Sequence, residues 1–130
     1  MTFKDKILVT IVVIVAFDAV SSLLSRVFHF DYNSLIGISL VMYVAAGYWG
    51  AHRRGFLFGL LLGALAGLAH STFGWWVSNW MRPFSKTGIP PIGLKLQLIV
   101  ITSVTAVGFL FGLIGAFLCK VFGQSKPLSA

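Results

Sequence analysis

Four long apolar runs alternate with short polar connections along the chain, at about residues 7–25, 34–51, 55–80 and 96–120. A bilayer core of about 30 Å is crossed by roughly 20 apolar residues in a helix that rises 1.5 Å per residue. The runs have this length or come close to it. The pattern predicts an all-α integral membrane protein, an antiparallel bundle of four transmembrane helices forming a single domain over residues 1–130. A proline-rich loop at 82–95 joins the last two helices, and Asn33 and Ser34 are the candidate N-caps of the second helix.

Small residues recur at three- or four-residue spacing in three of the predicted helices. Residues spaced in this way share one side of a helix, and in membranes such small-xxx-small stripes let two helices approach closely. The pattern predicts glycine-zipper (GxxxG) packing within one chain or between copies of it. The glycines concerned are Gly47 and Gly50 in the second run, Gly55, Gly59, Gly63 and Gly67 in the third, and Gly108 and Gly112 in the fourth.

Composition supports a membrane location. The chain is 58% hydrophobic and 10% charged, whereas soluble domains average about a quarter charged residues. The net charge of +7 comes from lysines and arginines at the ends of apolar runs rather than from a basic patch interleaved with aromatic residues. We therefore expect no nucleic-acid partner, and we expect the lipid bilayer to be the main surrounding.

The positions of the basic residues indicate an orientation. Four crossings put both termini on one face of the membrane. That face carries Lys4, Lys6, Arg53, Arg54, Lys120 and Lys126, and the other carries Arg26, Arg82, Lys86 and Lys95. An excess of six against four favours cytoplasmic termini in a multi-pass protein of the inner (cytoplasmic) membrane. Arg53 and Arg54 lie where contacts with lipid headgroups are expected.

The first apolar run also has features of a cleavable signal peptide. Lys4 and Lys6 precede an apolar core from Ile7 to Phe17, and the small residues Ala19 and Ser21 follow it. The apolar pattern continues beyond that point, however, which favours a retained first helix.

Polar residues of all four helices fall at one depth. At 1.5 Å per residue, Asp18, Tyr43, His70 and Thr105 lie roughly 12 to 18 Å from the face with the proline-rich loop, each on the small-residue side of its helix. Together with Ser21 and Ser22, they form a candidate intramembrane polar site. A buried ionisable pair of Asp18 and His70 is the functional interpretation. The structural alternative is a protonated Asp18 that fixes helix register and a neutral core His70.

The sequence contains no hydrolase, kinase or P-loop motif, and no catalytic residue or cofactor is expected. His29, His52 and His70 are predicted at different depths and cannot meet at one metal ion. The single cysteine, Cys119, excludes an intrachain disulfide and a cysteine-based metal cluster. We therefore expect a protein that is not an enzyme and that binds no metal.

Two function classes remain. The first is a structural or accessory membrane subunit that acts through glycine-mediated helix packing, with a second copy of itself or another membrane protein as partner. The second is a small proton-linked transporter or channel that uses Asp18 and His70. A subunit predicts a dry bundle with both side chains fully hydrogen-bonded, whereas a transporter predicts a water-accessible cavity that reaches them from one face.

The architecture resembles two families of small membrane proteins. Four helices and an acidic residue in the first, Asp18, are similar to the small multidrug resistance transporters, in which a membrane carboxylate exchanges protons for cationic drugs. In this chain an aspartate replaces that family's glutamate, and the surrounding motif differs. The segment STFGW at 71–75 resembles the Thr/Ser/Phe motif of fluoride channels. Neither resemblance assigns a function to a particular residue.

Overall fold

The computed structural model describes residues 2–52, 54–84 and 93–123, and these form four helical rods without a strand. The first rod is α1 (Phe3–Phe28). A 3-10 helix (Tyr32–Leu35) leads into α2 (Ile36–Ala51). The third rod consists of α3 (Phe56–Ala69), a π-helix (His70–Gly74) and α4 (Trp75–Met81), and the fourth is α5 (Leu94–Phe122). All four rods are long and apolar enough to cross a membrane. The prediction of an all-helical chain with four candidate membrane helices is confirmed.

The start of α1 is fixed by a capping box. The backbone N–H of Asp5 donates to Thr2 Oγ1 at 3.3 Å, and the backbone N–H of Thr2 donates to Asp5 Oδ2 at 2.6 Å. These bonds satisfy N–H groups that a helix start otherwise leaves unpaired. The helix therefore begins at Phe3, before the apolar run that predicted it at residue 7.

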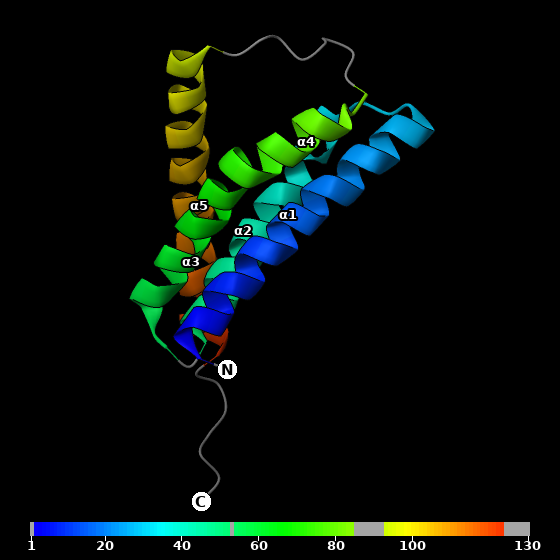
Figure 1. Cartoon of the computed structure of the whole chain (residues 1–130). Helices are drawn as coiled ribbons and strands as arrows, with labels where there is room; N and C mark the ends of the chain where they lie inside the picture. Colours follow the sequence, from blue (N-terminus) through cyan, green and yellow to red (C-terminus); the bar gives the residue numbers. More distant parts are fainter. Residues whose placement is uncertain (1, 53, 85–92, 124–130) are drawn as a thin grey trace, which may run out of the picture.

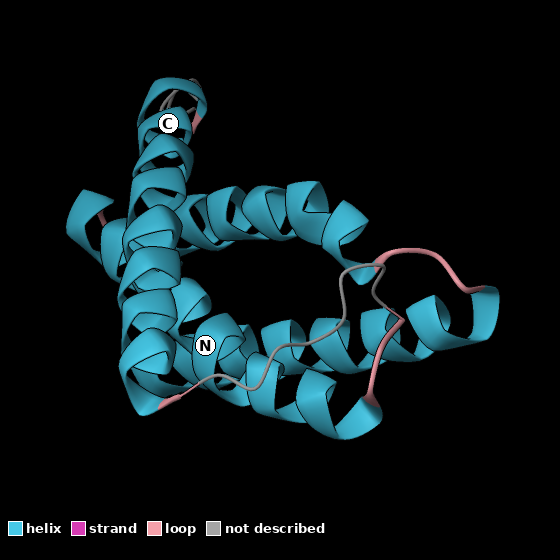
Figure 2. Ribbon diagram, turned by 90° about the horizontal axis from the view of Figure 1, so that it is seen from above, coloured by secondary structure: helices cyan, strands magenta, loops and turns pink. Residues whose placement is uncertain are grey.

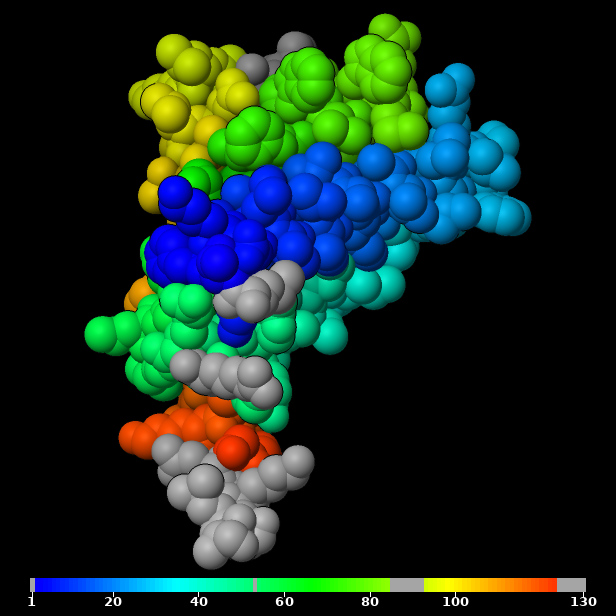
Figure 3. Space-filling model, turned by 60° about the horizontal axis from the view of Figure 1, so that its bottom comes forward, coloured from blue at the N-terminus to red at the C-terminus, as the bar shows by residue number. Residues whose placement is uncertain are grey.

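The rods are arranged with the start of α1, the end of α2, the start of α3 and the end of α5 at one end of the bundle (Figure 1). We call this the terminal end and the opposite one the loop end. Rods α2, α3 and α5 pack tightly against one another, whereas α1 packs mainly on the third rod and makes no contact with α5. Viewed from below, α1 forms a continuous band between the third rod and α2 (Figure 3). At the loop end, α5 stands apart from α1 and α4 (Figures 1 and 2).

The close packing of α3 against α5 depends on glycine. A Cβ atom added to Gly63 would lie 2.7 Å from the carbonyl oxygen of Gly108, and one added to Gly112 would lie 2.7 Å from Gly63 Cα. Only backbone stands opposite these positions, so no side chain can move aside. Gly47 of α2 faces the backbone of Gly112 in the same way, and Gly50 faces Gly59.

Gly55 does not belong to this packing, contrary to the prediction. It lies just before α3, and a Cβ atom there would meet nothing within 4 Å. Its φ of 94° lies in the left-handed region that favours glycine. Gly55 therefore serves the turn between α2 and α3. Of the predicted headgroup contacts at this turn, Arg53 lies outside the described residues, and the Arg54 guanidinium lies 5.8 Å from the centre of the Phe58 ring.

The side chain of Lys6 joins α1 to the end of α2. Its Nζ donates to the carbonyl oxygens of Trp49 at 2.9 Å and His52 at 3.1 Å, and it lies 5.1 Å from the centre of the Trp49 ring. The last carbonyls of a helix lack partners within the helix and carry partial negative charge. Lys6 is 6% exposed, so its positive charge caps α2 from inside the protein.

Replacing Lys6 by methionine is expected to lower the free energy of unfolding by about 2 kcal/mol, because two charge-assisted hydrogen bonds are lost while the apolar stem is kept. Reversible unfolding in mixed micelles measures this change. Lys4→Met is the matched control, since Lys4 is exposed, and it should change stability by less than about 0.5 kcal/mol. Equal effects of the two substitutions would contradict a capping function for Lys6.

Candidate functional site

Asp18 and His70 meet between α1 and the third rod. Asp18 is fully buried, and its Oδ1 lies 3.0 Å from Nδ1 of His70, whose side chain is 25% exposed. The contact has the distance of an ion pair but not the angles of a hydrogen bond, so Nδ1 has no hydrogen-bond partner. The second carboxylate oxygen, Oδ2, is also buried without a partner. The site therefore contains one acid and one base, each with unused hydrogen-bonding capacity.

A chain of hydroxyl groups reaches the carboxylate from the other side. The Tyr32 hydroxyl donates to Asp18 Oδ1 at 3.2 Å and lies 3.1 Å from Ser78 Oγ. Ser22 Oγ in turn donates to Ser78 Oγ at 2.9 Å. Ser22 and Ser78 are buried, so these bonds form away from bulk water. Asp18 thus ends a hydroxyl chain that comes from α1, α4 and the connection before α2.

The π-helix places this site within the third rod. The N–H of Trp75 donates to the carbonyl of His70, five residues earlier. One turn before, Ser71 Oγ donates to Gly67 O at 2.9 Å and Thr72 Oγ1 donates to Leu68 O at 2.6 Å. Hydroxyl groups that bond to carbonyls of the preceding turn favour bending of a helix, and single-turn π segments are frequent at functional sites. The prediction of one regular helix over 55–80 is therefore wrong at residues 70–74.

Gly74, the last residue of the π-helix, makes room for the carboxylate. A Cβ atom at this position would overlap Asp18 Oδ2 and would lie 2.8 Å from Asp18 Cγ. Any larger residue at position 74 therefore competes with Asp18 for the same space.

The remaining predicted site residues lie at different distances from the pair. The Tyr43 ring packs edge-on against the His70 ring, with ring centres 6.1 Å apart, and Ser21 is buried on α1. Thr105 lies on α5, and its Oγ1 is buried without a hydrogen-bond partner. The fold therefore gathers Asp18, Ser22, Tyr43 and His70 on α1, α2 and the third rod, whereas Thr105 bonds to none of them.

Tyr32 and Ser78 belong to the hydroxyl chain at Asp18, although they are not among the site residues predicted from the sequence. Asp31 is the N-cap of the 3-10 helix, since its side chain accepts the N–H of Asn33 at 3.0 Å. The N-cap of α2 is Leu35, so the prediction of Asn33 or Ser34 at this position is wrong. An N-cap at Asp31 puts Tyr32 into the first turn and turns its side chain towards the bundle. Ser78 follows the buried Ser71 and Gly74 at helical spacing, so this signal was present in the sequence.

A cavity of about 100 Å³ adjoins the pair on the side of the loop end. Tyr32 and His70, which both contact Asp18, form part of its wall. The rest of the wall comes from the second half of α1, the 3-10 helix and the start of α2. It consists of Phe17, Asn33, Leu35, Ile36 and Ser39. The buried acid is thus separated from a polar cavity by one tyrosine and one histidine.

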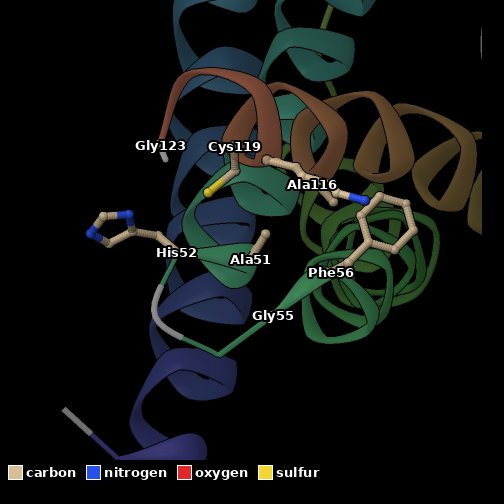
Figure 4. Close-up of a pocket in the computed structure, with 8 residues that line it drawn as sticks. Ala51, His52, Gly55, Phe56, Ala116, Cys119 and Gly123 are labelled. Atoms are coloured by element: carbon tan, nitrogen blue, oxygen red, sulfur yellow. The ribbon is translucent and has the colours of Figure 1, made fainter. Parts of the chain in front are cut away.

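A larger cavity, of about 360 Å³, lies at the terminal end (Figure 4). Cys119, Ala51 and Phe56 surround it, while the His52 ring points away from it (Figure 4). No acidic side chain is part of its wall. Among the described residues there is no group of three or more histidine, cysteine and acidic side chains that could hold a metal ion. The site with two interacting ionisable groups is therefore the one at Asp18.

Comparisons of this chain with known protein families, curated proteins and solved structures return no match.

Proposed function

We propose that this protein is a small proton-linked transporter or channel in which Asp18 takes up and releases a proton within the membrane and His70 stabilises the ionised form. The observation that supports this proposal is the fully buried carboxylate with an unpartnered oxygen, 3.0 Å from a histidine that borders a polar cavity. A packing residue would be expected to have all its polar atoms satisfied.

The cost of placing a charge in the membrane favours reversible protonation. An ionised aspartate at mid-membrane costs about 2.5 to 3.5 kcal/mol on insertion scales, and such residues usually take part in ion or proton pathways. Asp18 can lower this cost by binding a proton or by pairing with a protonated His70.

We further propose that the glycines of α2, α3 and α5 act as a glycine zipper that holds a rigid scaffold, against which α1 and its carboxylate are positioned. The protein is proposed to lie in the cytoplasmic membrane with cytoplasmic termini, on the basis of its lysine and arginine distribution.

Two measurements on protein reconstituted in vesicles test the main proposal. In the first, Asp18→Cys in a Cys119→Ser background is treated with a small water-soluble thiol reagent, which is expected to react from the loop end. Ser103→Cys in the same background, on the exposed face of α5, is the control for a lipid-facing thiol.

In the second measurement, an internal pH dye reports proton uptake driven by a potassium diffusion potential. Asp18→Asn is expected to lower this uptake on the order of 10²-fold.

Labelling together with Asp18-dependent uptake supports a channel or a leaky transporter. Labelling without uptake supports a transporter whose proton movement requires its solute. Absence of both in folded protein would overturn the proposal and would favour the structural or accessory subunit instead.

A further inference from the structure

We propose that Tyr32 is the proton relay to Asp18. In this conformation, Asp18 exchanges protons with the loop end only. The small cavity beside Tyr32 admits water rather than an organic solute. The inference rests on the proposed function, because it requires Asp18 to titrate. It adds the route, the side of access and the size limit of what can reach the site.

Tyr32 has the contacts that a relay needs. It borders the cavity, and its hydroxyl group donates to Asp18 Oδ1 at 3.2 Å. A hydroxyl group can accept one proton and donate another at the same time. In the relay step, a hydronium ion in the cavity gives a proton to the Tyr32 oxygen while the Tyr32 hydroxyl proton passes to Asp18 Oδ1. One O–H bond forms and one breaks at the tyrosine, which ends neutral, and the carboxylate becomes a carboxylic acid.

The serine hydroxyls can reset the relay. Ser78 Oγ lies 3.1 Å from the Tyr32 oxygen, and Ser22 donates to Ser78. After a transfer, the Tyr32 hydroxyl can turn towards Ser78 and back again. It has a hydrogen-bond partner in both positions, because Ser78 Oγ lies on one side of it and Asp18 Oδ1 on the other. His70 lacks this geometry, since its Nδ1 contact with Asp18 does not meet hydrogen-bond angles. Tyr32 is therefore the relay, and His70 acts through its charge.

The cavity volume limits the species that can approach. A water molecule takes about 30 Å³ in the liquid, so a cavity of about 100 Å³ holds about three water molecules. A short water chain fits this space and conducts protons along its hydrogen bonds. Drug-sized ligands occupy pockets of about 300 Å³ or more, so an organic cation of that size does not fit.

On the terminal side, an apolar cluster lies between the site and a hollow of about 330 Å³ that α1 and α2 line with mostly apolar side chains. Ile14 lies one turn before Asp18 on the buried side of α1 and packs with Tyr43, Ala66 and Ala69. These four residues are at most 3% exposed. The next polar group on this side of α1, Thr10, donates its hydroxyl to Lys6 O at 2.8 Å. The buried face of α1 therefore offers no polar side chain between Thr10 and Asp18.

Infrared spectroscopy of reconstituted protein tests the relay. The carboxyl band of Asp18 is identified as the band that Asp18→Asn removes, and its hydrogen–deuterium exchange is followed after a rapid change to D₂O. In Tyr32→Phe, the exchange rate is expected to fall on the order of 10²-fold while the final extent of exchange is unchanged. Tyr48→Phe, on the exposed face of α2, is the matched control and should keep the wild-type rate.

A second variant fills the cavity without removing the tyrosine. Ser39 is 5% exposed and forms part of the cavity wall, so Ser39→Leu should displace water and slow exchange as well. A wild-type rate in folded Tyr32→Phe would overturn the relay, even if Asp18 titrates. If the Asp18 carboxyl band of the wild-type protein does not change with pH, the proposed function is overturned instead. The two failures are therefore distinguishable.

Discussion

Replacing Gly63 by alanine is expected to lower the free energy of unfolding by about 3 kcal/mol, the upper part of the range for overpacked sites. The new Cβ atom would meet the Gly108 carbonyl oxygen at 2.7 Å as well as the Gly112 backbone. Backbone atoms cannot rotate away as side chains do, so α3 and α5 have to separate along their length. The separation would also disturb α2, because Gly47 packs on Gly112.

Reversible unfolding in mixed micelles, followed by circular dichroism, measures this effect. Gly37→Ala is the matched control, since Gly37 is a glycine of α2 whose added Cβ atom would meet nothing within 4 Å. It should leave stability unchanged or raise it by up to about 1 kcal/mol, the helix-propensity difference between the two residues. Equal stability of Gly63→Ala and wild type would show that α3 and α5 do not pack through these glycines.

Replacing Gly74 by alanine is expected to destabilise the protein by about 2 kcal/mol and to abolish any function of Asp18. The added Cβ atom would take the place of Asp18 Oδ2, so the carboxylate must turn away from Tyr32 and His70. A buried carboxylate that loses its partners is costly, since nothing else compensates its charge.

A double-mutant cycle isolates this contact. In an Asp18→Ala background, the space opposite Gly74 is empty, and Gly74→Ala should then cost less than about 0.5 kcal/mol. The difference between the two backgrounds is the coupling between positions 18 and 74. Additive effects of the two substitutions would contradict the close packing of Gly74 on the carboxylate.

The number of helices could be predicted from the sequence because it follows from local hydrophobic periodicity. The same periodicity put Asp18, Ser21 and Ser22 on one side of the first helix, and all three are buried in the structure. The approach of Asp18 to His70 could be predicted from their common depth and from their positions on the small-residue sides of their helices, since two antiparallel connections give helices one and three the same direction. These inferences required no knowledge of a specific contact.

The π-helix and Tyr32 could not be found by the same reasoning. A helical wheel assumes 100° per residue throughout, so it cannot reveal the π turn at 70–74. The turn ends at Gly74, which packs against Asp18 of α1, and this contact between two helices is not visible in the local sequence pattern. The contact between Tyr32 and Asp18 likewise depends on how the connection before α2 folds back over α1.

The buried position of Lys6 also bears on the charge that the predicted membrane protein would present to lipid headgroups. Its ammonium group contacts α2 carbonyls and is 6% exposed, so it is not available to anionic headgroups. Of the six basic residues that the sequence predicts at the face of the termini, five then remain to contact headgroups: Lys4, Arg53, Arg54, Lys120 and Lys126. Four are predicted at the opposite face. The predicted difference in headgroup-accessible charge is therefore one residue, and one lysine added at the face of the proline-rich loop would make the two faces equal.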